Sequence, residues 1–544
     1  MLLLIMSLTF SSPMIATDYY FSSKSGSDTN NGKSEQTPLK SLSKANELNM
    51  KPGDKLLLKR GDIFFDHIEL SGIKGVKNSP IIISAYGEGS TLPIINSKGY
   101  LNGILLEDCS YIEVSNLEIT ANGGGIGNLD PKGSYMRCGI MISHKKEGHY
   151  SGITLKNLFI RDVFYEEPGF ERSSAETLTP MGTQNYGWGI RVINSNPKAF
   201  VDDLKIVDSH IKNVGHTGIR LTGKKIPNSG DQKSIKNIEI KNNIVEYTGG
   251  PGMQASVVEN IYFVNNTIDH SGSGDDSRKW ARGSGLWVWG CFNALIEHNS
   301  FRNANGPGDS SGCHIDFNNK NVLIQYNLSE NNAGGFIHIF GNNRNSTYRY
   351  NVSINDGHRD HIPGKTLGHG YMVDINGWVG RNKKENGPYN TYIYNNTIYV
   401  KDSLHPQVGI AKTNEGLLIA NNIFYLESTP TYRDKPNFLP ENGPIPNAVF
   451  KNNLFLKADN WPDASKVMVT DKAPIYGDPQ FKNAGGTNIE DYIPQNKSLI
   501  KNKGIKIENI PGDPIGLWGG LEMKKDILGN KIEGLPDMGA IEID

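Results

Sequence analysis

Residues 285–289 read Gly-Leu-Trp-Val-Trp, and residues 312–316 read Gly-Cys-His-Ile-Asp. In both stretches a glycine precedes side chains that alternate between apolar and aromatic or polar, a period of two that is typical of a strand burying one face. The same pattern starts at nine glycines: Gly103, Gly139, Gly189, Gly218, Gly252, Gly285, Gly312, Gly334 and Gly370. Because successive glycines are 22 to 50 residues apart, the pattern predicts stacked coils rather than one compact sheet.

The outward positions of these strands carry the side chains that can bind or react. Two residues past the glycines, from Gly139 onward, stand Met141, Arg191, Arg220, Gln254, Trp287, His314, Phe336 and Met372. Four residues past them, from Gly252 onward, stand Ser256, Trp289, Asp316, His338 and Asp374. Since stacked strands lie about 4.8 Å apart, we expect Asp316 beside His338, and His314 over Trp287.

A recurrent asparagine supports the same architecture. It occurs in the strings that begin at Asn116, Asn157, Asn243, Asn266, Asn299, Asn327, Asn351, Asn396, Asn422 and Asn453. Asparagine tolerates left-handed backbone, and its amide can bond to the amide one coil above. We therefore expect these residues at the bends between strands.

The N-terminal segment offers a cover for the open end of the stack. Thr37 can cap a helix, and Pro38 suits its first turn. The residues Leu39, Leu42, Ala45 and Leu48 share one helical face. An uncovered end would expose core and strand edges, so a short capping helix is expected here.

Composition gives the chain an ordinary soluble character. The net charge is −1, which indicates neither nucleic acid nor a membrane surface as a partner. Residues 1–16 form an apolar run that ends in small residues, so they predict a secretory signal and a secreted or periplasmic protein with no membrane span. Cys291 and Cys313 fall at core positions, which favours buried thiols over disulfides.

These strings, together with PGDKLLLKRGD at 52–62 and SPIIISAYGEG at 79–89, resemble the right-handed parallel β-helix proteins of the pectate-lyase-like superfamily. The resemblance implies an all-β solenoid and an exported enzyme that degrades polysaccharides. The expected parts are a cap and first coils at 17–100, a β-helix with a catalytic groove at 101–460, and a C-terminal extension at 461–544 packed on the helix.

Candidate catalytic groups lie in loops just before the glycines and on the outward rows. Glycosidic hydrolysis needs one carboxylic acid and one carboxylate that acts as base or nucleophile. We choose Asp309 and Asp316 as this pair, with Asp275 or Asp276 as a third acid and His314 beside them. Gly-Asp-Asp at 274–276 resembles the paired aspartates of β-helix polygalacturonases but lies in a long loop. Turn formation is the plainer interpretation of each loop aspartate.

Substrate contacts are expected from the same rows and loops: Trp287, Trp289, Arg220, Arg191, Gln254, His338, Arg278, Arg282, Asp374 and His358. The tryptophans offer faces on which sugar rings stack. Arg191 and Arg220 either pair with surface carboxylates or bind an anionic uronate or sulfate group. His338 either binds substrate or bonds to Asp316.

The leading hypothesis is a secreted, monomeric glycoside hydrolase that acts on a complex polysaccharide or oligosaccharide. One version of this hypothesis takes the substrate to be acidic, with uronate or sulfate groups. The alternative is a polysaccharide lyase, in which His314, Arg220, Arg282 and Lys365 would supply the base and the cations. A non-catalytic carbohydrate-binding β-helix is the third interpretation. No cofactor is required and no metal site is predicted, although acidic loops offer ligands for calcium.

Overall fold

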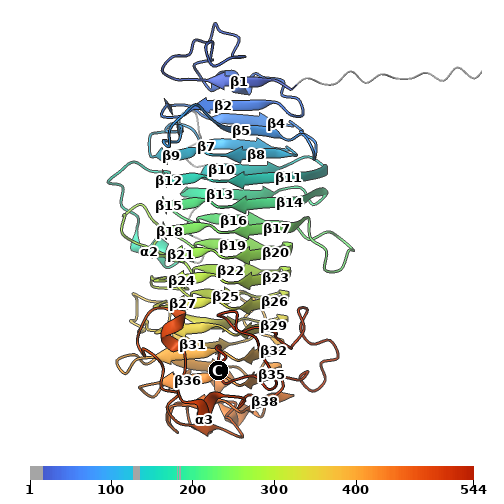
Figure 1. Cartoon of the computed structure of the whole chain (residues 1–544). Helices are drawn as coiled ribbons and strands as arrows, with labels where there is room; N and C mark the ends of the chain where they lie inside the picture. Colours follow the sequence, from blue (N-terminus) through green and yellow to red (C-terminus); the bar gives the residue numbers. More distant parts are fainter. Residues whose placement is uncertain (1–15, 127–134, 180–181, 183–184) are drawn as a thin grey trace, which may run out of the picture.

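The computed structural model describes residues 16–126, 135–179, 182 and 185–544. It is a right-handed parallel β-helix in which successive coils contribute strands to three parallel sheets, here sheets A, B and C. The strands lie above one another along the whole stack (Figure 1). The predicted all-β solenoid is confirmed.

Sheet A holds β1 (Asp18–Phe21), β2 (Lys55–Lys59), β5 (Ile81–Tyr86), β8 (Ile112–Ser115), β11 (Gly148–Lys156), β14 (Ala199–Val207), β17 (Ile235–Lys241), β20 (Glu259–Val264), β23 (Phe292–Glu297), β26 (Lys320–Gln325), β29 (Arg344–Arg349), β32 (Tyr389–Tyr394), β35 (Glu415–Ala420) and β38 (Ala448–Lys451).

Sheet B holds β3 (Ile63–Phe64), β6 (Ile94–Asn96), β9 (Glu118–Asn122), β12 (Phe159–Phe164), β15 (His210–Val214), β18 (Ile244–Thr248), β21 (Thr267–Asp269), β24 (Ser300–Arg302), β27 (Leu328–Glu330), β30 (Val352–Ile354), β33 (Thr397–Val400), β36 (Ile423–Leu426), β39 (Leu454–Phe455) and β40 (Ile475–Tyr476).

Sheet C holds β4 (Ile68–Ser71), β7 (Asn102–Glu107), β10 (Arg137–His144), β13 (Gly187–Asn194), β16 (Ile219–Thr222), β19 (Met253–Ser256), β22 (Leu286–Trp289), β25 (Cys313–Ile315), β28 (Gly335–Ile339), β31 (Tyr371–Ile375), β34 (Gln407–Ile410) and β37 (Thr431–Tyr432). This sheet contains the strands that follow the recurrent glycines.

The recurrent glycine is required by close packing at the corner between sheets B and C. A Cβ atom on Gly139 would lie 2.5 Å from Cγ2 of Ile160 and 2.9 Å from the carbonyl oxygen of Gly189 on the next coil. The apolar residues that follow the glycine, such as Ile140 and Ile142, are fully buried. The glycine thus lets three sheets close around one continuous apolar core.

The predicted asparagine ladder is present inside one bend. Nδ2 of Asn299 donates to Oδ1 of Asn327 at 3.0 Å, and Nδ2 of Asn327 donates to Oδ1 of Asn351 at 3.0 Å. The expected left-handed backbone belongs in these coils to the residue before the ladder: His298 and Tyr326 have φ of 55° and 58°. Asn116 and Asn157 do adopt the expected left-handed backbone, with φ of 56° and 51°, so only the later coils divide the two roles between neighbouring residues.

The N-terminal cap is shorter than predicted. Leu39 forms a bridge with Phe21, so the expected helix start at Thr37 is wrong, and α1 (Ser43–Asn46) is a single turn. Leu42 and Ala45 are nevertheless fully buried at the end of the core. The other helical elements are α2 (Ser174–Thr177), α3 (Lys497–Ile500) and the 3-10 turns η1 (Pro436–Phe438), η2 (Pro440–Asn442) and η3 (Ile489–Tyr492).

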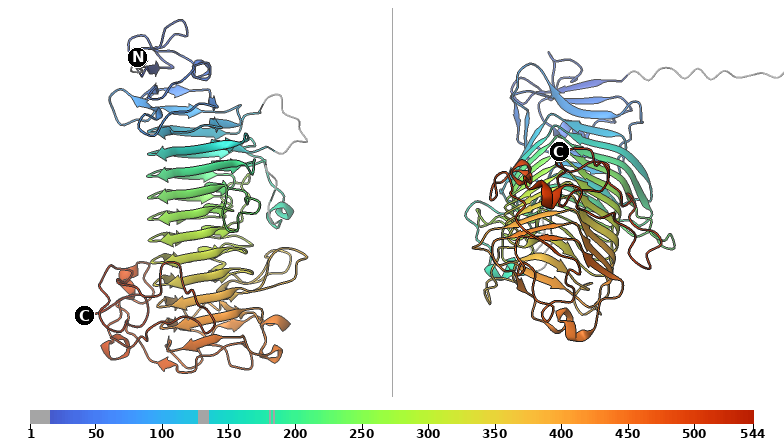
Figure 2. Two further views of the ribbon diagram at one scale, coloured as in Figure 1. Left: turned by 90° about the vertical axis from the view of Figure 1, so that its right-hand side faces the viewer. Right: turned by 60° about the horizontal axis from the view of Figure 1, so that its bottom comes forward.

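The segment after residue 461 lies against the outside of the stack. Tyr394 on β32 donates to the carbonyl of Leu521 at 2.7 Å, and Tyr326 donates to that of Lys525 at 2.7 Å. Sheet B itself continues to β40, beyond the boundary expected at residue 460. Figure 2 shows this segment on one side near the C-terminal end, with long loops projecting from the opposite side.

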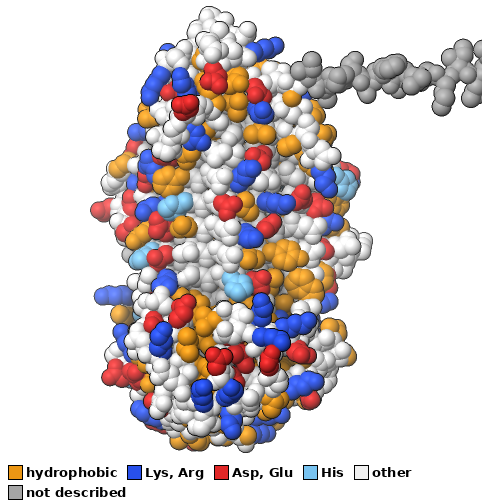
Figure 3. Space-filling model, viewed as in Figure 1, with side chains coloured by type: hydrophobic (Ala, Val, Ile, Leu, Met, Phe, Trp, Pro, Cys, Tyr) orange, Lys and Arg blue, Asp and Glu red, His pale blue; other side chains and the backbone are white. Residues whose placement is uncertain are grey.

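Other expectations concern the ends and the surface. Residues 1–15 of the predicted signal lie outside the described part of the chain. Within that part, no helix has the length and apolar character needed to cross a bilayer. The four cysteines are buried free thiols. Acidic and basic side chains are interspersed on the face drawn in Figure 3, in keeping with the net charge of −1.

Candidate active site

The outward side chains of sheet C form one row across neighbouring coils. Trp287 on β22 pairs in register with His314 on β25, and their rings stack 5.7 Å apart at 8°. His338 on β28 pairs with Asp374 on β31. Residues that are far apart in the sequence thus become neighbours on one surface, as the repeat predicts.

The position of Asp316 is a correction to the sequence analysis. Ile315 pairs with Ile339, so His338 stands beside His314, and Asp316 is opposite Phe340 instead. The sequence pattern equated Gly334 with Gly312, because Gly334 resembles the recurrent glycine. In the structure Phe336 occupies the position equivalent to Gly312 in this coil.

The prediction that the side chains of Phe336 and Met372 point outward is also wrong. Their side chains are 1% and 3% exposed and belong to the main apolar core. They stand where earlier coils have the recurrent glycine, at the start of the strand. In these two coils the residue equivalent to the recurrent glycine therefore lies two positions later than the sequence pattern placed it.

A pocket of about 260 Å³ opens on this part of sheet C. Its lining includes the predicted residues Arg282, Asp309, His314, His338 and Asp374. It also includes Ser311, Phe340, Arg359, Tyr371, Asn376, Trp378, Glu385, Arg433 and Phe438, none of which was selected from the sequence.

Asp309 is a carboxylate held by arginine. Nε of Arg282 lies 3.0 Å from its Oδ2, and Nη1 of Arg359 donates to its backbone carbonyl at 3.0 Å. The Asp309 side chain is 43% exposed, so its desolvation is only partial, and the charge and hydrogen bond of Arg282 outweigh that effect and hold the pKa of Asp309 below its usual value. Asp309 is therefore ionised at neutral pH.

The backbone around Asp309 is strained. Asp309 and Ser310 both adopt left-handed backbone, with φ of 53° and 59°. Elsewhere in the described residues, positive φ does not occur at two consecutive non-glycine positions. Such conformations cost roughly 1–3 kcal/mol each and cluster at functional sites. Oγ of Ser310 donates to the carbonyl of Gly308 at 2.9 Å, which stabilises this turn.

Asp316, seven residues further along, has the opposite electrostatic surroundings. Its Oδ1 accepts the backbone N–H of Phe317 at 2.9 Å, and no described arginine or lysine pairs with it. Desolvation raises the pKa of Asp316 to about 8, a rise to which the negative charge of Asp309 contributes. This carboxyl group is therefore largely protonated at neutral pH.

The two histidines in the row are neutral hydrogen-bonding groups. Nδ1 of His314 lies 3.1 Å from Oγ of Ser284, and Nδ1 of His338 lies 2.9 Å from Oγ of Ser311. Burial lowers the pKa of each imidazole to about 3. Nε2 of His338 is buried and has no hydrogen-bond partner among the described residues.

Asp374 forms the far end of the pocket with an arginine from a distant loop. Nη1 of Arg433 lies 3.0 Å from its Oδ1, and Nδ2 of Asn376 donates to its Oδ2 at 3.1 Å. Desolvation raises the pKa of Asp374, although Arg433 opposes the rise. Asp374 is thus a buried, paired group that can position a ligand through Arg433.

An aromatic rim faces the solvent at this end. Trp378 is 42% exposed, and its ring packs edge-on against Phe317 at 5.1 Å and Phe340 at 5.9 Å. A sugar ring presents apolar C–H groups that pack on such a face. Trp378 follows β31 in a loop outside the repeat pattern, which explains why the sequence did not single it out.

Some predicted residues do not line the pocket, and the proposed catalytic residue Asp316 is one of them. Asp275 pairs with Lys279 at 2.6 Å, and Asp276 pairs with Arg278 at 2.6 Å. His358 lies behind the pocket, with Nδ1 3.4 Å from the carbonyl of Asn355, whereas the adjacent Arg359 lines it.

The remaining predicted contacts follow sheet C toward the N-terminus. Gln254 is buried and donates to Ser256 at 3.1 Å. Trp289 is half-buried and packs edge-on against Phe317 at 5.7 Å. Trp287, Arg220 and Arg191 continue the row that contains His314.

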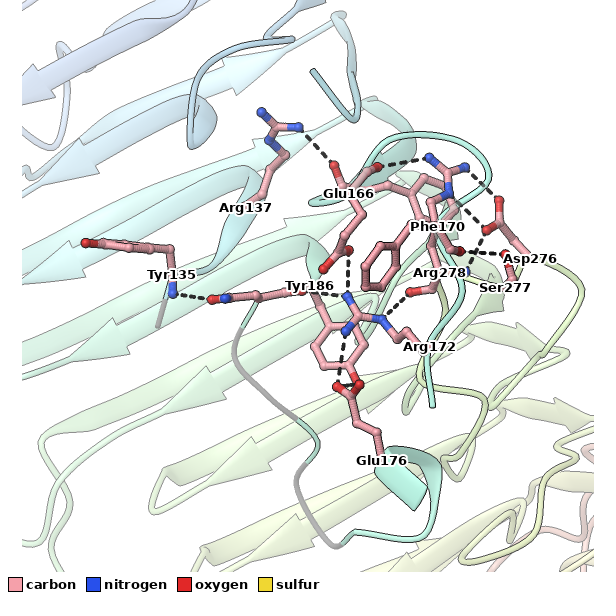
Figure 4. A network of polar contacts seen from close by, with 12 residues as sticks. Tyr135, Arg137, Glu166, Phe170, Arg172, Glu176, Tyr186, Asp276, Ser277 and Arg278 are labelled. Carbon is pink, nitrogen blue, oxygen red and sulfur yellow. Dashed lines mark hydrogen bonds and ion pairs between the residues drawn. The ribbon is translucent and has the colours of Figure 1, made fainter. Parts of the chain in front are cut away.

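The loops beside the pocket form a braced wall, part of which is drawn in Figure 4. Arg172 pairs with Glu166 at 2.6 Å and Glu176 at 3.1 Å, and its Nε donates to the carbonyl of Arg278 at 2.6 Å. The loop that carries α2 then reaches the pocket, because the carbonyl of Thr179 accepts Nη1 of Arg282 at 2.7 Å. The wall therefore fixes the arginine that binds Asp309.

Comparison with known proteins gives one relative that is similar in sequence. No protein-family model matches the chain. A lacto-N-biosidase of Bifidobacterium longum subsp. longum is 26% identical over 97% of this chain but only 36% of that relative, so the chain spans about a third of its length.

Two solved structures with a partly similar trace are the following. The lacto-N-biosidase of glycoside hydrolase family 136 from Eubacterium ramulus is 20% identical, with a TM-score of 0.47 over 85% of this chain and 68% of that one. Pectate lyase Pel9A is 15% identical, with a TM-score of 0.40 over 98% of each chain.

Proposed function

We propose that the protein is a glycoside hydrolase that cleaves a glycosidic bond of a complex polysaccharide or oligosaccharide with two carboxyl groups. The carrying observation is the opposite pKa shift of Asp309 and Asp316, which flank the single strand β25. Two carboxyl groups whose surroundings drive their pKa values apart are suited to be one acid and one base or nucleophile. The similarity to a lacto-N-biosidase supports this class of reaction.

In the proposed reaction the protonated Asp316 acts as the general acid. It gives its proton to the glycosidic oxygen while the bond from that oxygen to the anomeric carbon breaks. The ionised Asp309 either attacks the anomeric carbon or removes a proton from the attacking water. If Asp309 attacks, water then cleaves the glycosyl ester at the anomeric carbon, which releases the Asp309 carboxylate, and the Asp316 carboxylate takes the proton of that water. If Asp309 acts as the base, it ends protonated and Asp316 ends ionised, and both exchange protons with solvent before the next turnover. Neither step uses a cofactor, so activity should survive chelation of calcium.

The other pocket residues hold the sugar rather than exchange protons. The neutral imidazoles of His314 and His338 can bond to hydroxyl groups, and Trp378 offers a stacking face. Arg282 stabilises the charge of Asp309 before the reaction. This arrangement orients the sugar against Asp309, which lines the pocket. Asp316 lies two residues after His314 and is not among the lining residues, so in the proposed reaction the glycosidic oxygen extends beyond the pocket to reach it.

The test is hydrolysis of a panel of glycans by the full chain and by Asp309→Asn and Asp316→Asn, with Asp463→Asn as control because Asp463 is exposed on the C-terminal segment. Both site variants should lose about 10³-fold or more in kcat, and the control should not. An aryl glycoside with an acidic leaving group needs little proton donation, so Asp316→Asn should still cleave it and Asp309→Asn should not. The reverse pattern would exchange the two roles, and full activity of both variants would reject the site.

A polysaccharide lyase remains the second candidate because of His338. Its imidazole is neutral and its Nε2 is unpartnered in the described residues, as a base for abstracting the proton at C5 of a uronate must be. The two reactions differ in product: a lyase leaves an unsaturated sugar that absorbs ultraviolet light, and a hydrolase consumes water and leaves none. Hydrolysis is favoured by the two carboxyl groups.

We also infer that the protein is exported, on the basis of the apolar run at 1–16. Fractionation of the cells that produce it tests this directly. Recovery of the full-length chain only inside the cell would contradict the inference.

A further inference from the structure

Two arginines project side by side from sheet C on the N-terminal side of the pocket. Arg191 on β13 pairs in register with Arg220 on β16. Arg191 is 4% exposed and Arg220 is half-buried, yet no carboxylate among the described residues forms an ion pair with either. A buried cation is normally paired, because its desolvation is expensive.

Arg172 shows how a buried arginine in the same fold is normally neutralised. Arg172 is equally buried but has two glutamates as partners (Figure 4). Arg191 has only carbonyl acceptors, those of Val192 at 2.7 Å and Arg220 at 3.3 Å. Desolvation and, to a smaller extent, the charge of Arg220 together lower the pKa of Arg191 to about 9. The two guanidinium groups thus repel each other without a counter-charge from the described chain.

The same patch presents several hydrogen-bond donors that the protein leaves unused. Buried atoms without a partner among the described residues are Nε of Arg191, Nε of Arg220, Nε1 of Trp188 and Oγ1 of Thr222. Three of these are N–H groups that can only donate, and the fourth is a hydroxyl. An oxygen-rich, negatively charged group would satisfy them, since it supplies acceptors and charge together.

The patch is continuous with the candidate active site. Arg220 pairs with Gln254, Gln254 with Trp287, and Trp287 with His314, each on the next coil. Three strand spacings of about 4.8 Å put Arg220 roughly 14 Å from His314 along the stack. A glycan that extends from the pocket along sheet C would therefore reach the two arginines. The sugar unit that contacts them would not be one of the two joined by the bond being cleaved.

We propose that Arg191 and Arg220 form a subsite for an acidic group, a carboxylate or a sulfate ester, on the glycan substrate. The proposal rests on the proposed function for the identity of the ligand as a glycan, but the anion site itself can be measured without turnover. It makes acidic glycans the preferred substrate class.

The experiment measures binding of inorganic sulfate, glucuronate and neutral glucose to the full chain by calorimetry at low salt. The variants are Arg220→Gln, Arg220→Lys and, as a matched control, Arg344→Gln, since Arg344 is exposed on sheet A and stacks on Tyr389 at 4.1 Å. Wild type and Arg344→Gln should bind at least one of the two anions but not glucose. Arg220→Gln should bind that anion about tenfold to a hundredfold more weakly, with Arg220→Lys between them.

The choice of anion identifies the group: glucuronate binding assigns a carboxylate, and sulfate binding assigns a sulfate ester. No saturable binding of either anion by wild type would overturn the proposal even if Arg220→Gln failed to fold, as would equal binding by a folded Arg220→Gln. Glycan hydrolysis with no anion site would reject this subsite and keep the hydrolase. An anion site in a chain that cleaves no glycan would reject the hydrolase instead.

Discussion

Nε of Arg282 lies 3.0 Å from Oδ2 of Asp309, and the guanidinium that makes this contact is itself fixed by the carbonyl of Thr179 at 2.7 Å. The arginine belongs to the loop before β22, and the aspartate to the loop before β25. Two loops from neighbouring coils and the α2 loop therefore determine jointly whether Asp309 is ionised. The protonation of Asp309 therefore depends on the loops beside the pocket as well as on sheet C.

Replacing Arg282 should shift the acidic limb of the pH–rate profile. In Arg282→Gln the charge that lowers the pKa of Asp309 is gone while its partial desolvation remains, so the pKa of Asp309 should rise. The acidic limb of kcat/KM should therefore move to higher pH, and kcat at neutral pH should fall. The pH–rate profile of Arg344→Gln serves as the reference. If the acidic limb of Arg282→Gln coincides with that of Arg344→Gln, Arg282 does not lower the pKa of Asp309.

The sequence predicted the sheet-borne half of the site well, because sheet positions follow from a period of two and a coil spacing. Trp287, His314 and the pair His338 and Asp374 lie where the repeat places them. The error at Asp316 arose because the glycine at 334 resembles the repeat signal, although Phe336 occupies the equivalent place. A recurrent residue locates a strand but does not fix its register.

The loop-borne half was largely missed, because loop length and not alternation determines where those side chains go. Arg359 was passed over for its neighbour His358, and both belong to an insertion whose path the sequence does not specify. Arg433 comes from a segment where the repeat weakens, yet it pairs with Asp374 across 59 residues. Such contacts require the three-dimensional path of the chain.

Ionisation of Asp316 should make the folded protein less stable as pH rises. In the unfolded chain this carboxyl group titrates near 4, whereas in the fold it keeps its proton to about pH 8. Between these values unfolding releases a proton, so its contribution to the free energy of unfolding is present at low pH and is lost progressively up to about pH 8. Thermal unfolding from pH 4 to 9 should show a steeper decline for wild type than for Asp316→Asn, in which Asp356 and Glu542 still have raised pKa values. Parallel curves for the two proteins would show that the pKa of Asp316 is not raised.

Loss of the aromatic rim should weaken substrate binding more than chemistry. Trp378→Ala removes an exposed stacking face, and a stacking contact of about 0.5–1.5 kcal/mol corresponds to a rise in KM of roughly twofold to tenfold with little change in kcat. Trp518→Ala is the matched control, since Trp518 is 40% exposed on the C-terminal segment. An equal effect of the two substitutions on KM would mean that Trp378 does not contact the sugar.

Asn327 should be among the most sensitive polar positions of the β-helix. Its side chain is fully buried; Oδ1 accepts the backbone N–H of Asn299 at 2.9 Å, and Nδ2 donates to the carbonyl of Ile296 at 2.9 Å. In Asn327→Ala these partners stay buried without a bond, so the free energy of unfolding should fall by roughly 1–3 kcal/mol. Gln232→Ala, at an exposed position, should change it by less than about 0.5 kcal/mol. Urea unfolding followed by circular dichroism measures both; a loss in Asn327→Ala no larger than in the control would show that the ladder contributes geometry but no stability.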